Sequence, residues 1–178
     1  FPAMQIFAGL GNKAFLESKG LGQVTELYWW DSRPVGTLKV TSVPTQHFSN
    51  RGLFDSEGTL WTGYALEGPG GKTYFAGDTG FGPHFAEVGQ KLGPFRLAVL
   101  PIGAYLPEWF MKPIHISPMD AVRAAKDLQA QLTVPMHYGT FPLADDGERE
   151  AVEALERTVA STPQPFKVLE FGEGFDVP

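Results

Sequence analysis

The chain has 178 residues, of which 43% are hydrophobic and 19% charged, a composition typical of a folded globular protein. Its formal net charge of −6 argues against nucleic acid as a partner, because a nucleic-acid surface needs an excess of lysine and arginine. The absence of cysteine excludes disulfides and thiolate metal sites, so any transition-metal site must use histidine and carboxylate ligands.

No apolar run approaches the ~18 to 20 residues of a membrane span, and no signal peptide is visible. The second observation carries little weight because the chain begins with Phe1 rather than methionine. We expect a cytoplasmic protein or one at the periphery of a membrane.

The first half of the chain predicts strands and the second half alternates between helices and strands. Segments rich in β-branched and aromatic residues predict strands at 24–30, 37–43, 59–66 and 72–76. Helical spacing of apolar residues follows at 85–92, 121–128 and 152–159. The apolar runs 97–102, 132–136 and 166–171 predict strands buried on both faces. This order predicts a mixed sheet with helices over one face, and we expect residues 1–178 to form one structural unit.

One helix has a clear start. Ser117 is suited to be the N-cap, Pro118 the first helical residue, and Asp120 follows three positions after the cap.

The segment 72–81, KTYFAGDTGF, places a carboxylate between glycines at the end of a predicted strand. Gly-Asp-x-Gly is ordinary turn chemistry, so a plain turn is one interpretation of Asp78. A functional carboxylate is the other.

Two histidines occupy similar positions, since His47 and His137 also follow predicted strands. Side chains just past strand ends can converge on one point of a sheet protein. Neutral imidazole suits zinc, iron or manganese, and a carboxylate can bridge two such ions. His47, Asp78 and His137 are therefore candidate metal ligands, with separate structural roles as the alternative.

The other two histidines lie at predicted helix starts. His115 stands just before the helix at Ser117, where it is either a structural helix-entry residue or a group that moves protons. For His84 we expect an exposed side chain without a function.

Five blocks in consistent order resemble the metallo-β-lactamase superfamily, and in particular its branch of N-acyl-phosphatidylethanolamine-hydrolysing phospholipases D. They are Gln46-His47 with RGLFD at 51–55 and Leu60-Trp61, then YFAGDTG, GPFRLAVLPIGAY, PEWFMKPIH and MHYGTFPL. The resemblance runs from about Trp29 to Leu143.

The resemblance implies an α/β fold of the α+β type, an αββα sandwich with two zinc ions between its sheets; manganese or iron would suit the same ligands. In matching blocks, His47 binds one ion, Asp78 bridges both and His137 binds the other. His115 corresponds to a catalytic histidine beside the metals. Tyr105 and Trp109 belong to a block that shapes the substrate pocket, with core packing as the alternative for Trp109 and Phe110.

The sequence departs from the family in two places. The motif H-x-H-x-D-H, which supplies further ligands, is absent from this chain, so the chain resembles the C-terminal half of the domain. Leu106 and Glu108 replace the usual Glu-Pro-Arg, and a lost arginine would weaken phosphate capture.

The function implied is hydrolysis of a phosphodiester, with an N-acylated phospholipid as the substrate. Alternatives are a metal-dependent hydrolase of lactones, thioesters or cyclic phosphates, and a non-catalytic fragment. A half sandwich would expose an apolar sheet face, so we expect an N-terminal segment or a partner chain to cover it. A homodimer and peripheral membrane contact remain open, the latter through Trp29, Trp30 and Trp109 with their apolar neighbours.

Overall fold

The computed structural model describes residues 4–50, 52 and 56–177. Positions 51 and 53–55 of the RGLFD block lie outside the described residues. The elements in chain order are β1 (Ile6–Gly9), α1 (Lys13–Ser18), β2 (Val24–Leu27), β3 (Ser32–Val35), β4 (Leu38–Val43), β5 (Gly63–Gly68), β6 (Gly71–Phe75), α2 (His84–Leu92), β7 (Leu97–Pro101), α3 (Glu108–Met111), α4 (Pro118–Asp127), β8 (Thr133–Met136) and α5 (Glu150–Val159).

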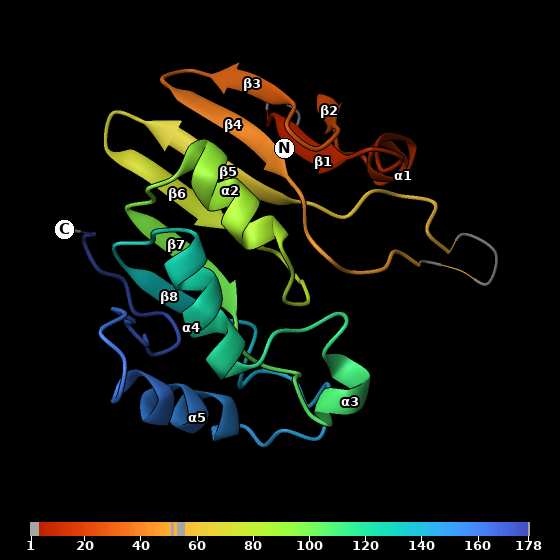
Figure 1. The fold of residues 1–178 in the computed structure, drawn as a ribbon. Helices are drawn as coiled ribbons and strands as arrows, with labels where there is room; N and C mark the ends of the chain where they lie inside the picture. The colour runs from red at the N-terminus through yellow and green to blue at the C-terminus, as the bar shows by residue number, and fades with distance from the viewer. Residues whose placement is uncertain (1–3, 51, 53–55, 178) are drawn as a thin grey trace.

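A mixed six-stranded sheet in the order β3-β4-β5-β6-β7-β8 forms the body of the molecule (Figure 1). The strands β3 to β6 pair antiparallel, and β6, β7 and β8 pair parallel. The parallel pairs need crossover connections, which α2 and α4 provide. The predicted mixed sheet is confirmed.

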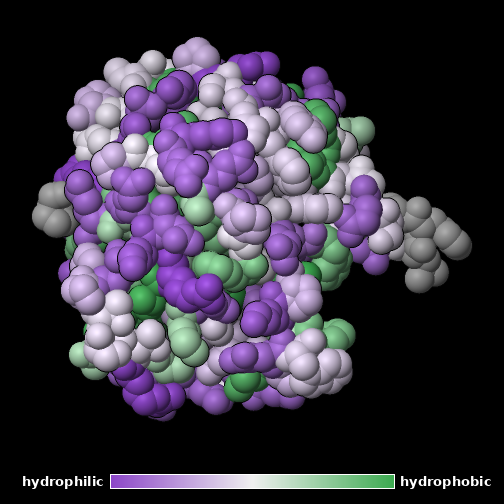
Figure 2. All heavy atoms as spheres, in the orientation of Figure 1, coloured by the Kyte–Doolittle hydropathy of each residue, from purple (hydrophilic) through white to green (hydrophobic). Residues whose placement is uncertain are grey.

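Helices α2 and α4 pack over one face of this sheet, and α5 packs beside α4 (Figure 1). Every second residue of the central strands points into this layer, including Tyr74 and Leu100, which are fully buried. They join Phe85, Ile116 and Leu155 in the main core. Figure 2 shows the outer side of this layer as mostly hydrophilic, with scattered apolar side chains.

The opposite sheet face is only partly covered. The residues between the buried ones are Tyr64, Leu66, Thr73, Phe75, Leu97, Val99, Val134 and Met136; none of them is fully buried, and Phe75 is 42% exposed. The strands β7 and β8 are therefore buried on one face, and the expectation that they are buried on both is wrong for this chain.

A separate two-stranded parallel sheet of β1 and β2 lies at the edge of this face. The Tyr64 hydroxyl donates a hydrogen bond to the carbonyl of Phe7 over 3.2 Å. The sequence patterns predicted neither β1 nor α1, because both are short and lack a clear period.

Three strand predictions need correction. The strand predicted at 59–66 begins only at Gly63, as β5, because the Leu60 amide bonds to the carbonyl of Leu10 instead of a sheet neighbour. The strand predicted at 24–30 ends at Leu27, because Tyr28 and Asp31 form a turn closed by backbone and side-chain hydrogen bonds. The segment 166–171 is not a strand: it contributes a single bridge between Phe166 and Thr133, and beyond it the Leu169 carbonyl accepts from the Tyr138 hydroxyl and the Glu170 amide donates to the Glu173 side chain. The N-cap prediction is confirmed, since the Ser117 side chain accepts a hydrogen bond from the Asp120 amide.

Candidate metal centre

The candidate ligands lie at one edge of the six-stranded sheet. The strands β4, β6 and β8 all run in the same direction, because β4 is antiparallel to β5, β5 is antiparallel to β6, and β6 to β8 are parallel. Their carboxyl ends therefore meet at a common edge. His47, Asp78 and His137 follow these three strands, which places them where a sheet protein gathers functional groups.

The side chains converge as the sequence predicts. The Nε2 atom of His137 lies 3.4 Å from Oδ1 of Asp78. The ring of His115 stacks on that of His137 with 5.2 Å between centroids, and it meets the ring of His47 edge-on at 5.4 Å. His115 therefore stands between the two candidate ligands, although it comes from the loop between α3 and α4.

His47 is arranged as a metal ligand would be. Its Nδ1 lies 2.9 Å from the carbonyl oxygen of Phe48, so the N–H of this nitrogen donates to the backbone. Its Nε2 is buried and has no hydrogen-bond partner. A ligating histidine commonly donates one N–H to a carbonyl and offers the other nitrogen to the ion. The donor set fits a transition metal on this ground.

Within the described residues, no three histidine or acidic side chains lie close enough together to hold a single metal ion. The division implied by the resemblance, in which His47 and His137 would serve different ions and Asp78 would bridge them, stays a prediction. Each ion would then need further ligands, because structural and catalytic zinc sites take at least three from the protein.

The backbone has a positive φ angle just before Asp78 and at His137. Gly77 adopts a positive φ of 66°, which glycine tolerates without strain and which turns the chain before Asp78. His137 itself has a φ of 61°, rare for a residue with a side chain. Such strain is characteristic of functional positions. The chain therefore bends at Asp78, although residues 77–80 are not closed into a turn by a hydrogen bond of their own; the Gly80 amide donates to the Gln46 carbonyl instead.

The surroundings of His115 favour its neutral form. It is buried, and its Nδ1 has no hydrogen-bond partner. Burial, with the neighbouring His137, lowers the pKa of His115 below its ordinary value. A neutral imidazole can either donate or accept a proton, as a catalytic group must.

Hydrogen bonds tie the ligand loops together at Gln46 and Thr79. The backbone N–H of Gln46 donates to Thr79 Oγ1 at 2.9 Å. The backbone N–H of Gly80 donates to the backbone carbonyl of Gln46 at 2.7 Å. The Gln46 side chain donates to the Pro113 carbonyl at 2.7 Å, near His115. Sequence reasoning did not single out Gln46 or Thr79 for this role, although both sit beside candidate ligands within the recognised motifs.

The expectation that His84 is exposed is wrong. Its side chain is 7% exposed, and its Nε2 lies 3.3 Å from Thr79 Oγ1. Burial lowers the pKa of His84 to about 4. The first residue of α2 looks exposed in the sequence, but the 78–80 loop folds over it.

The two pocket candidates lie in different environments. Tyr105 is buried, and burial, with the nearby Glu150 carboxylate, raises its pKa. Trp109 is 82% exposed and Phe110 61% exposed, so neither residue packs in the core of this chain. Their rings contact each other edge-on on α3, the helix that leads into His115.

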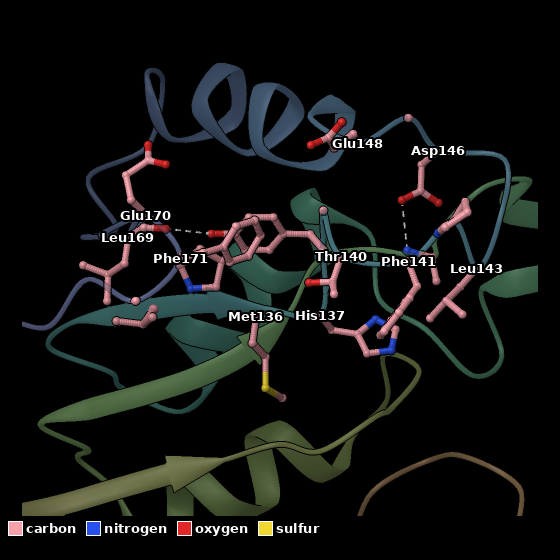
Figure 3. Close-up of a pocket in the computed structure, with 18 of the residues that line it drawn as sticks. Met136, His137, Thr140, Phe141, Leu143, Asp146, Glu148, Leu169, Glu170 and Phe171 are labelled. Atoms are coloured by element: carbon pink, nitrogen blue, oxygen red, sulfur yellow. Dashed lines mark hydrogen bonds between the residues drawn. The ribbon is translucent and has the colours of Figure 1, made fainter.

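A cavity of about 780 Å³ opens beside His137 (Figure 3). Figure 3 shows Leu169 and Glu170 at one end and Phe141 and Leu143 at the other. Its charged lining residues are all carboxylates: Asp146, Glu148, Glu170 and Glu173. Asp146 also accepts a hydrogen bond from the Ala104 amide at 3.0 Å, which joins the loops after β7 and β8.

The fold and the convergent histidines and aspartate define a metallo-β-lactamase-type protein. The family model described as the β-lactamase superfamily domain matches residues 4–138, and the chain belongs to this superfamily. The chain is also similar to N-acyl-phosphatidylethanolamine-hydrolyzing phospholipase D 1 of Caenorhabditis elegans, with 41% identity over 152 residues, covering 80% of this chain and 43% of that protein.

Two further comparisons agree with membership of this superfamily. The mitochondrial N-acyl-phosphatidylethanolamine-hydrolyzing phospholipase D of Saccharomyces cerevisiae is 36% identical over 153 residues, covering 82% of this chain and 33% of that protein. The solved structure of Igni18, described as a metallo hydrolase from Ignicoccus hospitalis, has a TM-score of 0.69 at 25% identity, covering 93% of this chain and 65% of that one.

The chain spans less than half the length of these two phospholipase relatives. Among the described residues, no helix has both the length and the apolar character needed to cross a membrane.

Proposed function

We propose that the chain carries one half of the active site of a metal-dependent hydrolase, and that its reaction is the phospholipase D-type cleavage of an N-acylated phospholipid or a related phosphodiester. The convergence of His47, Asp78 and His137 at one sheet edge, with His47 Nε2 buried and unpartnered, carries the proposal. The names of the two phospholipase relatives support the choice of substrate.

The residues of this chain divide the work. His47 and His137 would each hold one zinc ion, with manganese or iron as alternatives, and Asp78 would bridge the two. Bound divalent ions lower the pKa of water and neutralise charge on a phosphoryl group. His115 offers a neutral imidazole that can hydrogen-bond a phosphoryl oxygen or move a proton. Tyr105 and Trp109 would form the wall on the α3 side.

The sheet face around Phe75 supports a proposal about the rest of the site. An N-terminal segment of the same protein would cover this face and supply the remaining ligands, and a partner chain or a second copy would serve the same purpose. Residues 1–178 would then form a single unit, half of an αββα sandwich. Exposed apolar patches of more than a few hundred Å² are rare on soluble monomers.

The test uses the complete protein. Wild type should hydrolyse N-acyl-phosphatidylethanolamine only when loaded with metal, and Asp78→Asn should lose both this activity and bound metal. Asp78→Asn that hydrolyses the lipid at the wild-type rate would overturn the assignment.

One observation favours a second candidate, the hydrolysis of an uncharged ester or thioester. The cavity beside His137 has four carboxylates and neither lysine nor arginine in its lining, and Leu106 and Glu108 stand where the family resemblance implies Glu-Pro-Arg. Such a lining repels a phosphate outside the reach of the metals. Hydrolysis of a lactone or thioester panel, with no cleavage of phosphodiesters, would establish this candidate instead.

A further inference from the structure

Thr79 is a fully buried polar residue next to a candidate metal ligand. Its hydroxyl has one proton to give and two lone pairs to offer. The Gln46 amide occupies one lone pair at 2.9 Å, and the Gly80 carbonyl, which can only accept, lies 2.8 Å away and takes the proton. The remaining lone pair faces Nε2 of His84 at 3.3 Å. This arrangement favours the tautomer of His84 that carries its proton on Nε2.

His84 suits this role because it is nearly inaccessible to water. Its ring packs against Phe85 with 4.2 Å between centroids, and burial disfavours the charged form. A neutral imidazole with a proton on Nε2 is a fixed donor at neutral pH. The hydroxyl of Thr79 then makes three hydrogen bonds, and the bond from His84 fixes its position relative to α2.

We propose that Thr79 and His84 are positioning residues, which set Asp78 relative to His47. Thr79 directly follows Asp78, and Gln46 directly precedes His47. The two loops are joined at two points, by the Gln46 amide to Thr79 Oγ1 and by the Gly80 amide to the Gln46 carbonyl. His84, at the start of α2, holds Thr79 in place through the contact between its Nε2 and Thr79 Oγ1. The inference rests on the proposed metal centre and concerns how it is assembled, independently of the bond that is cleaved.

The first test compares Thr79→Val with Thr79→Ser in the complete protein. Valine keeps the shape of threonine but removes the hydroxyl, whereas serine keeps the hydroxyl. Zinc affinity is measured by competition with a chelator, and the unfolding temperature is measured in the metal-free form. Loss of a group that orients a ligand typically costs about 10- to 100-fold in metal affinity, so Thr79→Val should lose this much and Thr79→Ser should stay close to wild type.

A second pair of variants, at His84, tests the positioning role if Thr79→Val fails to fold. His84→Gln retains an N–H donor and should keep most of the zinc affinity, whereas His84→Leu should lose as much as Thr79→Val. Nitrogen-15 NMR of the metal-free protein should show His84 protonated on Nε2.

The inference is overturned if Thr79→Val binds zinc like wild type, if Thr79→Ser is as weak as Thr79→Val, or if His84 carries its proton on Nδ1. Lower metal-free stability with unchanged zinc affinity would likewise overturn it, because that pattern marks a purely structural role. A wild-type protein that binds zinc but cleaves no phosphodiester would overturn the proposed function and leave this inference standing.

Discussion

His137 and Asp78 are distant in the sequence, yet Nε2 of the first lies 3.4 Å from Oδ1 of the second. They meet because β6 and β8 run parallel with β7 between them, so both residues leave the sheet at the same edge. The metal proposal depends on this contact.

Removal of the bridging carboxylate should abolish stabilisation by metal. Zinc at 100 times its dissociation constant should raise the free energy of unfolding of the complete wild-type protein by about 2.7 kcal/mol for each site that it fills, and a chelator should reverse the effect. Asp78→Asn should show little of this gain. Glu156→Gln, an equal change of charge at an exposed position of α5, should show all of it. Thermal unfolding with and without zinc is the measurement, and an undiminished gain in Asp78→Asn would contradict the bridging role.

A methyl group at Gly103 should disturb His137. A Cβ on Gly103 would lie 2.1 Å from the carbonyl oxygen of His137, so the backbone must move. We expect Gly103→Ala to lower the stability by about 1 to 3 kcal/mol and to weaken zinc binding. Gly174→Ala meets no atom within 4 Å and is the control. Equal zinc affinity in the two variants would show that the loop after β7 does not hold His137 in place.

The buried His84 should make stability depend on pH. Its pKa falls from 6.5 to about 4 on folding, so the unfolded chain binds a proton first as the pH is lowered. The stability that the neutral, buried His84 contributes is complete above pH 6.5, and it is lost as the pH falls towards the folded pKa. At 1.36 kcal/mol per pH unit, it should decrease by about 2 kcal/mol between pH 7 and pH 5.

Urea unfolding of metal-free wild type and His84→Gln at both pH values isolates this contribution. Other titrating groups, including His115, remain in both proteins, so the difference belongs to His84. Equal losses of stability in the two proteins would refute the prediction.

Trp109 should contribute to substrate binding rather than to stability. Because it is 82% exposed, Trp109→Ala should change the free energy of unfolding by less than about 0.5 kcal/mol. If it forms the pocket wall, KM for a lipid substrate should rise while kcat stays nearly constant. Phe15→Ala, an exposed aromatic residue of α1, is the control. An unchanged KM would remove Trp109 from the site.

Phe75 reports on whether the open sheet face is covered in the complete protein. Phe75→Lys should lower the stability of that protein by about 2 kcal/mol or more, since a covered face would bury the new charge. Met119→Lys, on the exposed side of α4, should have little effect. If Phe75→Lys is as mild as this control, the face stays in water and the proposed covering segment is absent.

Much of the architecture could be predicted from local patterns. The alternation at β4 and β6 and the helical spacing in α2, α4 and α5 set those elements within a few residues, because each period follows from local backbone geometry. The Ser117 cap was predictable for the same reason. Short elements such as β1 and α3 have too few residues to show a period.

The candidate ligands were visible in the sequence because polar side chains at strand ends are a local feature. His47, Asp78 and His137 each follow an apolar strand, and the direction of the strands then brings them to one edge. Their role as ligands stays a prediction that the experiments above address.

The sequence by itself determined the order of most elements, the absence of cysteine ligands from this chain and the identity of the residues that this chain can offer to a metal. Only the tertiary structure decided that His84 is buried against Thr79, that Trp109 is exposed, and that Gln46 joins three loops. The reason is physical: periodicity depends on neighbouring residues, whereas the burial of a loop side chain depends on which distant segment packs over it.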